Sequence, residues 1–263
     1  ALWKVLEDIA PPGLGLLMLK NLEKFEPNLE IAVLGINKSH PPMYRALKYF
    51  SGSMEHYYLT NPGIQNFNII YFKDKSYRGN PIVSKIKLIY KELFEEDLLR
   101  NNYIYSSDNY SCYKSSVYFI NKYFKHPIYN YKIFHLEINK KKSALIVFRV
   151  ININNNIIIR IIDFEGDETL IAYMGKFALD LLVEEKAEYL DFMQYGIQKK
   201  YFIEAGFSLL NNTQDVIIPN YFEPLVKKNI PLLFSHNLYK KTNFRLFKGD
   251  GDQDRPNQVS KNA

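Results

Sequence analysis

Two groups able to move protons lie close together at an expected short strand, residues 188–194. Asp191 alternates with Leu190 along that strand, so its carboxylate is predicted to face a cleft. A buried carboxyl group with a raised pKa can act as a base. Tyr195 brings a hydroxyl group to the same end of the strand. We take Asp191 and Tyr195 as catalytic candidates, and the alternative for Asp191 is a structural carboxylate that caps a neighbouring loop.

A second polar group follows the last expected strand of this region, residues 215–218. Pro219 and Pro224 stiffen the segment between them, as in many ligand-facing loops. Asn220 and Glu223 could bind hydroxyl groups of a ligand, and Tyr221 could stack on it or donate a proton. Tyr221 and Glu223 are therefore catalytic candidates and Asn220 is a substrate-binding candidate. A rigid surface turn explains the same residues equally well.

A third polar group lies on an expected strand over residues 54–59. His56, Tyr57 and Tyr58 are consecutive there, and Asn61 follows the strand. An imidazole, hydroxyl groups and an amide could line a pocket for a polar substrate, so His56, Tyr58 and Asn61 are substrate-binding candidates. The alternative is that these tyrosines simply pack on a half-buried strand.

Composition limits the other kinds of chemistry. The single cysteine, Cys112, can form neither an internal disulfide nor a cysteine-based zinc site, and the start shows no signal-peptide pattern, so we expect a cytoplasmic protein. No His, Asp or Glu spacing meets a zinc or iron rule, and residues 250–254 lack the later positions of a calcium loop, so no metal is expected.

The formal net charge is +6, but the lysines are scattered among acids, which indicates a solvated basic surface rather than nucleic-acid binding. No run of about 20 uncharged apolar residues exists, so no membrane partner is expected.

Apolar periodicity and turn residues predict the elements that position these groups. Helices are expected over residues 2–9, 16–25, 41–50, 81–101, 111–124, 168–186 and 198–205. Strands are expected over residues 29–34, 54–59, 67–72, 131–138, 143–151, 157–164, 188–194, 208–210 and 215–218, the last two finishing one sheet. Polar turns at 140–142 and 152–156 predict two tight hairpins within 131–164.

From residue 81 onward the expected order is helix, helix, three antiparallel strands, helix, strand, helix and two strands. This order, with the strand Ala187-Glu188-Tyr189-Leu190-Asp191-Phe192, a helix and then Ala205-Gly206-Phe207, resembles the GNAT superfamily of acyltransferases over about residues 81–224. The resemblance implies an α/β (α+β) fold with a mixed, mostly antiparallel sheet flanked by helices.

The same resemblance implies a thioester donor, acetyl-CoA or another acyl thioester. In that fold the strands matching 157–164 and 188–194 splay apart, the pantetheine arm pairs with the exposed backbone, and the next helix N-terminus faces the pyrophosphate. The matching cofactor-binding positions are Ile162, Asp163, Phe164, Gly166 and Lys176. The family's glycine-rich loop is replaced by Phe164-Glu165-Gly166-Asp167-Glu168-Thr169, whose three acids repel a pyrophosphate.

Two further resemblances bear on organisation and substrate. Residues 30–36 resemble 189–197, as in the tandem GNAT pair of Fem-type peptidyl transferases, and chance matching of short apolar segments is the alternative. We therefore expect a partial, truncated GNAT-like domain over 1–78, a GNAT-like domain over 79–248 and a polar tail over 249–263.

Residues 217–224 and 248–257 resemble GNAT-like proteins of bacterial surface-sugar (polysaccharide) biosynthesis. This implies an N-acyltransferase whose small-molecule acceptor is an amine, such as that of an amino sugar or sugar nucleotide. The alternative is a non-catalytic GNAT-like module that binds a ligand or a partner, and a homo-oligomer is compatible with either.

Overall fold

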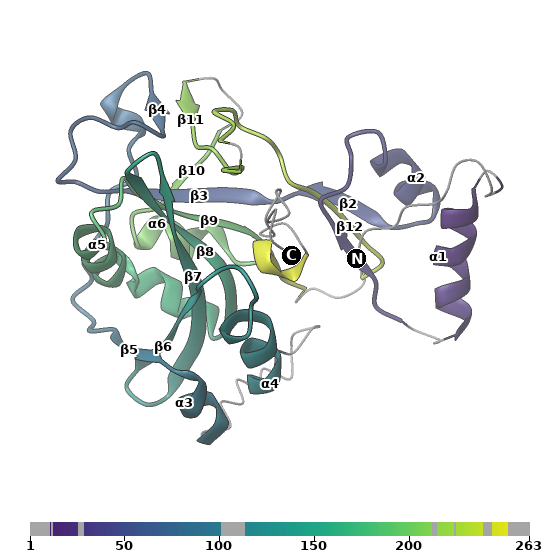
Figure 1. Cartoon of the computed structure of the whole chain (residues 1–263), viewed down its shortest axis with the longest axis horizontal. Helices are drawn as coiled ribbons and strands as arrows, with labels where there is room; N and C mark the ends of the chain where they lie inside the picture. Colours follow the sequence, from purple (N-terminus) through teal and green to yellow (C-terminus); the bar gives the residue numbers. More distant parts are fainter. Residues whose placement is uncertain are drawn as a thin grey trace. The chain divides into compact units, whose positions relative to one another are not determined.

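A computed structural model of the chain describes residues 11, 13–25, 29–100, 114–211, 215–223, 225–238 and 244–251. The chain divides into two compact units, shown in Figure 1. Unit 1 comprises residues 1–52 and 232–242, and unit 2 comprises residues 53–231 and 243–263. The division into 1–78, 79–248 and 249–263 concerns the origin of these parts and stays a prediction. Within the described ranges, no helix has the length and apolar character needed to cross a bilayer.

Unit 1 combines helices with a small sheet. The helices are α1 (Leu14–Phe25) and α2 (Pro41–Ala46). The strands β1 (Ala32–Leu34), β2 (Phe50–Ser53) and β12 (Leu233–His236) pair in the order β1-β12-β2. A small core of Leu19, Tyr44 and Tyr49 holds these elements together. The expected helix over residues 2–9 lies outside the described residues.

Unit 2 is built on a large mixed sheet. Its described strands run in the order β10-β3-β9-β8-β7-β6-β5, and β13 also pairs with β9. They are β3 (Glu55–Thr60), β5 (Ile89–Leu93), β6 (Lys132–Ile138), β7 (Lys142–Ile153), β8 (Asn156–Gly166), β9 (Tyr189–Tyr195), β10 (Ser208–Leu209) and β13 (Leu246–Phe247). Only the β8–β9 pairing is parallel. The expected mixed, mostly antiparallel sheet is confirmed.

Helices cover both faces of this sheet (Figure 1). On one face lie η3 (Glu168–Tyr173), α5 (Gly175–Glu184) and α6 (Lys199–Glu204), which bury the main core with alternate residues of the strands. The opposite face packs against α3 (Glu95–Arg100), α4 (Ser116–Phe119) and the π-helical turn η2 (Ile120–Phe124). On that same face, further along β7 and β8, a third core forms under residues 69–72 and 216–222. The central strands β7 and β8 are therefore buried on both sides, which explains their near-continuous apolar runs.

The two expected hairpins are confirmed. β6 pairs with β7 and β7 with β8 in antiparallel register. Asn139 and Lys140 in the first turn, and Asn154 and Asn155 in the second, have positive φ angles. Consecutive positive φ values are the geometry of the tight turns that match strand twist, and asparagine tolerates them well.

The expected helix over residues 81–101 is wrong. Residues 81–88 are irregular, residues 89–93 form β5, and α3 begins only at Glu95. β5 pairs with β6 from Ile89↔Glu137 to Leu93↔Ile133, and Ile82, Ile86 and Ile89 are exposed. Their helical spacing matched no buried face, so pairing with β6 determined the structure.

Two other expectations need correction. The strand over 67–72 is limited to β4 (Tyr71–Phe72). β11 (Val216–Ile217) does not finish the main sheet but pairs with β4 in a separate two-stranded ribbon. The segment that follows β11 instead contacts the main sheet through the side chain of Arg160 on β8.

Candidate functional site

The strands β8 and β9 separate partway along their length. Their parallel pairing covers Ile159↔Leu190, Arg160↔Asp191 and Ile161↔Phe192. Beyond it, β13 pairs with the later residues of β9, with Leu246 opposite Tyr195 and Phe247 opposite Gln194. The 3-10 turn η4 (Lys248–Asp250) follows β13 at once. We call residues 244–251 the closing segment, because they lie where the two strands part (Figure 1).

A β-bulge in β8 determines which side chains face this region. Ile161 pairs with Phe148 and Asp163 with Val147, so Ile162 is the extra residue. A bulge of this kind re-aims the side chains that follow it. Ile162 joins the core under α4 and η2, and Asp163 faces the same helices through a bond from the Tyr123 hydroxyl.

Asp163 lies in a buried cluster with one cation and a second acid. Lys114 Nζ is bonded to Asp163 and lies 2.6 Å from Asp250 Oδ1. The Tyr123 hydroxyl donates to Asp163 at 2.6 Å. Burial raises the pKa of Asp163 against the attraction of Lys114, and the negative charge of Asp250 raises it further by repulsion. Burial alone would lower the pKa of Lys114, but the two carboxylates outweigh it, so Lys114 stays protonated.

Glu165, two residues further along β8, has the properties of a base. Glu165 is only 4% exposed. This burial raises the pKa of its carboxyl group to about 7, although the nearby positive charges of Lys114 and Arg245 act to lower it. A carboxyl group that titrates near neutral pH can both accept and return a proton.

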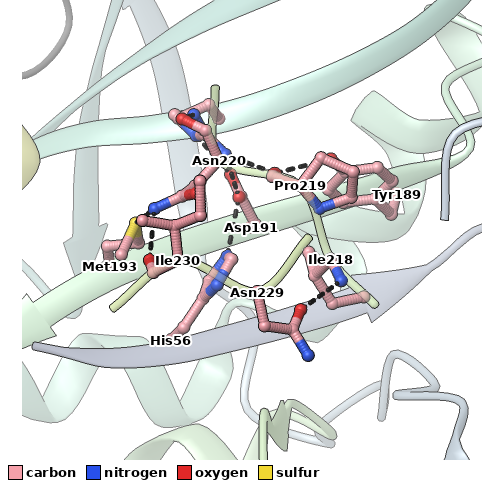
Figure 2. Close-up of polar contacts among 10 residues, drawn as sticks. His56, Tyr189, Asp191, Met193, Ile218, Pro219, Asn220, Asn229 and Ile230 are labelled. Carbon is pink, nitrogen blue, oxygen red and sulfur yellow. Dashed lines mark hydrogen bonds and ion pairs between the residues drawn. The ribbon is translucent and has the colours of Figure 1, made fainter. Parts of the chain in front are cut away.

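A second buried cluster joins β3, β8 and β9. Arg160 Nε donates to Asp191 Oδ1 at 2.9 Å and Nη2 donates to Oδ2 at 2.5 Å, a bidentate pair. His56 Nε2 lies 2.8 Å from the same Oδ2 (Figure 2). Burial lowers the pKa of His56, so the neutral ring donates this bond. All three residues are at most 7% exposed.

Arg160 also anchors the segment after β11. Its guanidinium donates to the carbonyl oxygens of Pro219 and Asn220 at 3.1 and 3.0 Å, and it stacks on Phe222 with its central carbon 4.6 Å from the ring centre. The Asn220 amide donates to the Ile230 carbonyl at 2.8 Å, as Figure 2 shows. Asn220 is therefore buried, and its backbone carbonyl and side-chain amide both bond to other parts of the protein.

The pKa of Asp191 is not raised as a catalytic base would require. Burial favours a raised value, but the charge and hydrogen bonds of Arg160, with the bond to His56, hold the pKa of Asp191 at about 2. A carboxylate this acidic holds protons poorly at neutral pH. Its observed role is to keep Arg160 and His56 in place.

The closing segment contacts most of the candidates on β8 and β9. Arg245 donates to the Gly166 carbonyl at 3.0 Å, Phe247 packs on Phe164, and a Cβ atom at Gly249 would lie 3.0 Å from Ile162. Tyr195 faces Phe244, and Lys248 Nζ lies 5.4 Å from the centre of the Tyr221 ring. The structure therefore brings Ile162, Asp163, Phe164, Gly166, Tyr195 and Tyr221 to one place, around residues 244–251.

The remaining candidates have separate structural contacts. The Asn61 amide bonds the carbonyls of Leu182 and Ala187, and Tyr58 donates to the Tyr77 carbonyl. Glu223 accepts from the Tyr129 hydroxyl at 2.8 Å. Lys176 pairs with Asp180 on the half-exposed surface of α5. The partners in these contacts lie outside the closing segment.

Sequence reasoning missed three of the groups that matter here: Lys114, Arg160 and Glu165. Lys114 is 49 residues from its partner, so no local pattern marks it. A charged residue inside the apolar run 157–164 was a usable signal for Arg160, because such a charge needs a buried partner. Glu165 was noted only as an acid of the loop.

No protein-family model matches this sequence, and no curated protein matches it significantly. The fold is similar to the crystal structure of a GCN5-related N-acetyltransferase from Anabaena variabilis, with a TM-score of 0.50 and 9% identity. The match covers 86% of this chain and 51% of that protein, so this chain spans about half the length of its structural relative. The chain therefore has a GNAT-like fold.

Proposed function

We propose that the protein is an N-acyltransferase that moves an acyl group from a thioester to an amine. The observation that carries this proposal is Glu165, a buried carboxyl group with a pKa of about 7 on the part of β8 that continues after β8 and β9 separate at Ile161, in a GNAT-like fold. A bound thioester supplies the activated acyl group. As the amine attacks and the C–S bond breaks, Glu165 takes the proton that the amine loses and returns it to the departing thiolate, because its pKa is matched to neutral pH.

The residues present do not fit a coenzyme pyrophosphate in the usual place. The N-terminus of η3 is capped by Asp167, whose carboxylate accepts from the Thr169 amide at 2.9 Å, and Glu168 follows. Lys142, the nearest bonded cation, lies 3.7 Å from Asp167 and donates to Thr169. An anion placed there meets acids first, which favours a donor with a less charged carrier than CoA.

The acceptor we propose is the amine of an amino sugar or sugar nucleotide in a cytoplasmic reaction. The sequence resemblance of residues 217–224 to proteins of surface-sugar biosynthesis supports it, and Tyr221 beside the closing segment offers a hydroxyl and a ring for a sugar.

A second function is favoured by one observation. The closing segment is packed against β9 as a strand of the protein itself. A GNAT-like module that no longer transfers acyl groups and only binds a partner would keep such a segment permanently in place.

The test is release of free thiol from acetyl-CoA and from S-acetylpantetheine, each mixed with a panel of amino sugars, sugar nucleotides and peptide amines. We expect amine-dependent release that rises with pH through about 7 and falls about 100-fold or more in Glu165→Gln. Glu137→Gln, a strand glutamate paired across to Ile89, is the matched control and should keep full activity. Thiol release that is absent with every amine, or equal in Glu165→Gln, would remove the proposal.

A further inference from the structure

The backbone of β9 beyond Phe192, which β8 leaves unpaired, pairs with β13 of the same chain. β8 leaves β9 after the pair Ile161↔Phe192, and backbone groups left unpaired in a protein interior are costly. β13 supplies the missing ladder at Gln194 and Tyr195. Residues 244–251 thus occupy the one stretch of β9 to which an extended, amide-bearing ligand could add as a strand.

The closing segment is fitted closely and held by charge. Gly196 has a φ of 100°, and a Cβ atom there would lie 2.1 Å from the Phe244 carbonyl oxygen. At the other end, Lys114 bonds Asp250 and Lys122 bonds the Gly249 carbonyl. Phe247 fills the space between, packed on Phe164 and stacked on Phe192.

The strand of the same segment is nevertheless short. It has two residues, against eleven in β8 and seven in β9. Lys114 is paired with Asp163 of β8, and Asp250 of the closing segment is its second acidic partner. Loss of Asp250 therefore leaves Lys114 with a countercharge, so the segment can leave without stranding a buried cation.

We propose that residues 244–251 are a strap that closes the groove between β8 and β9 and must move out before the thioester arm can pair with β9. This inference rests on the proposed function, because it takes the thioester as the competing ligand. The strap and the donor then compete for the same backbone, and Asp250 sets the balance through Lys114.

Locking the strap tests this directly. Leu246 and Tyr195 are opposite residues of an antiparallel pair, whose Cα atoms lie about 4.5 or 5.5 Å apart, within the range of a disulfide. In a Cys112→Ser background we would replace both by cysteine. Binding of acetyl-CoA and S-acetylpantetheine is then measured by calorimetry on the oxidised protein and on the same protein after reduction. We expect binding by the reduced form and at least tenfold weaker binding by the oxidised form.

Loosening the strap should have the opposite effect. Asp250→Asn should strengthen binding by about tenfold, since it raises the fraction of molecules with an open groove. Glu95→Gln, which removes an exposed partner of Lys125, is the control and should leave affinity unchanged. In the natural chain, hydrogen exchange at the Leu246 and Phe247 amides should speed up when the thioester is added.

The outcomes separate the strap from the reaction. Equal affinity of the oxidised and reduced forms, with no gain in Asp250→Asn, shows that the segment does not gate the groove and leaves the reaction intact. Absence of binding in every form, Asp250→Asn included, removes the thioester itself and the strap proposal with it.

Discussion

The pair between Arg160 and Asp191 is fully buried, so each charge depends on the other. Asp191→Asn leaves the guanidinium in the interior without its countercharge, and we expect the free energy of unfolding to fall by about 3–5 kcal/mol. Urea denaturation measures this. Glu95→Gln, in an exposed pair 3.8 Å from Lys125, should change stability by less than about 1 kcal/mol. Equal losses in the two variants would show that Arg160 is stabilised by the Pro219 and Asn220 carbonyls alone.

Glu165 makes stability depend on pH in a defined direction. Its pKa of about 7 in the folded protein lies above the ordinary 4.5, so the protonated form is the one the fold favours. This favourable contribution is present below pH 4.5 and is lost as pH rises through 7, a change of about 3 kcal/mol. Glu165→Gln mimics the protonated form. It should match the natural protein near pH 4 and exceed it in stability above pH 7, and parallel pH curves would contradict the raised pKa.

The sequence predicts where the candidate residues lie better than it predicts what each of them does. Asp191 lies on one expected strand, and Ile162, Asp163 and Phe164, which the resemblance to GNAT proteins implies, lie on another; all four flank the divergence of β8 and β9. The role expected of Asp191 depended on its pKa, which is set by Arg160 on another strand. Electrostatic environments arise from tertiary contacts, so a local pattern gives the residue and not its charge state.

Gly206, just after α6, lets residues 80–82 pass close to the end of that helix. A Cβ atom at Gly206, whose φ is 93°, would lie 1.9 Å from the Asn80 carbonyl oxygen. Backbone strain alone would lower the free energy of unfolding of Gly206→Ala by about 1–2 kcal/mol. Because of the added clash with Asn80, we expect a clearly larger loss. Gly13→Ala is the matched control, because Gly13 has a φ of 83° with nothing within 4 Å. Thermal unfolding of the two variants compares them, and equal losses would mean that residues 80–82 yield easily.

The hairpins, which carry their own turn signals, were predicted, whereas β5 and β13, which form through pairing with other strands, were not. The hairpins β6–β7–β8 carry asparagine and lysine at the turns, which fixes both their existence and register. β5 was mistaken for a helix because isoleucines at 82, 86 and 89 share a helical spacing. β13 was not predicted at all, since nothing in two residues announces a strand that joins β9.

The two units differ in how much core protects them. Among its described residues, unit 1 has a small core cluster of Leu19, Tyr44 and Tyr49, whereas the central strands of unit 2 are packed on both faces. We expect amides of β1 and β12 to exchange through openings of lower free energy than those of β7 and β8. Native-state hydrogen exchange read by mass spectrometry distinguishes the units. Equal protection would show that the molecule opens only as a whole.

The position of β12 has a consequence for synthesis of the chain. β12 is the middle strand of its sheet, yet it is made about 200 residues after β1 and β2. On the ribosome, residues 32–53 leave the exit tunnel with their edges unpaired, and they wait while nearly all of unit 2 is translated. At about 5–20 residues per second that interval lasts roughly 10–40 seconds. Residues 32–53 are thus made well before the strand that completes their sheet, which makes them a natural client for a chaperone that shields open strands.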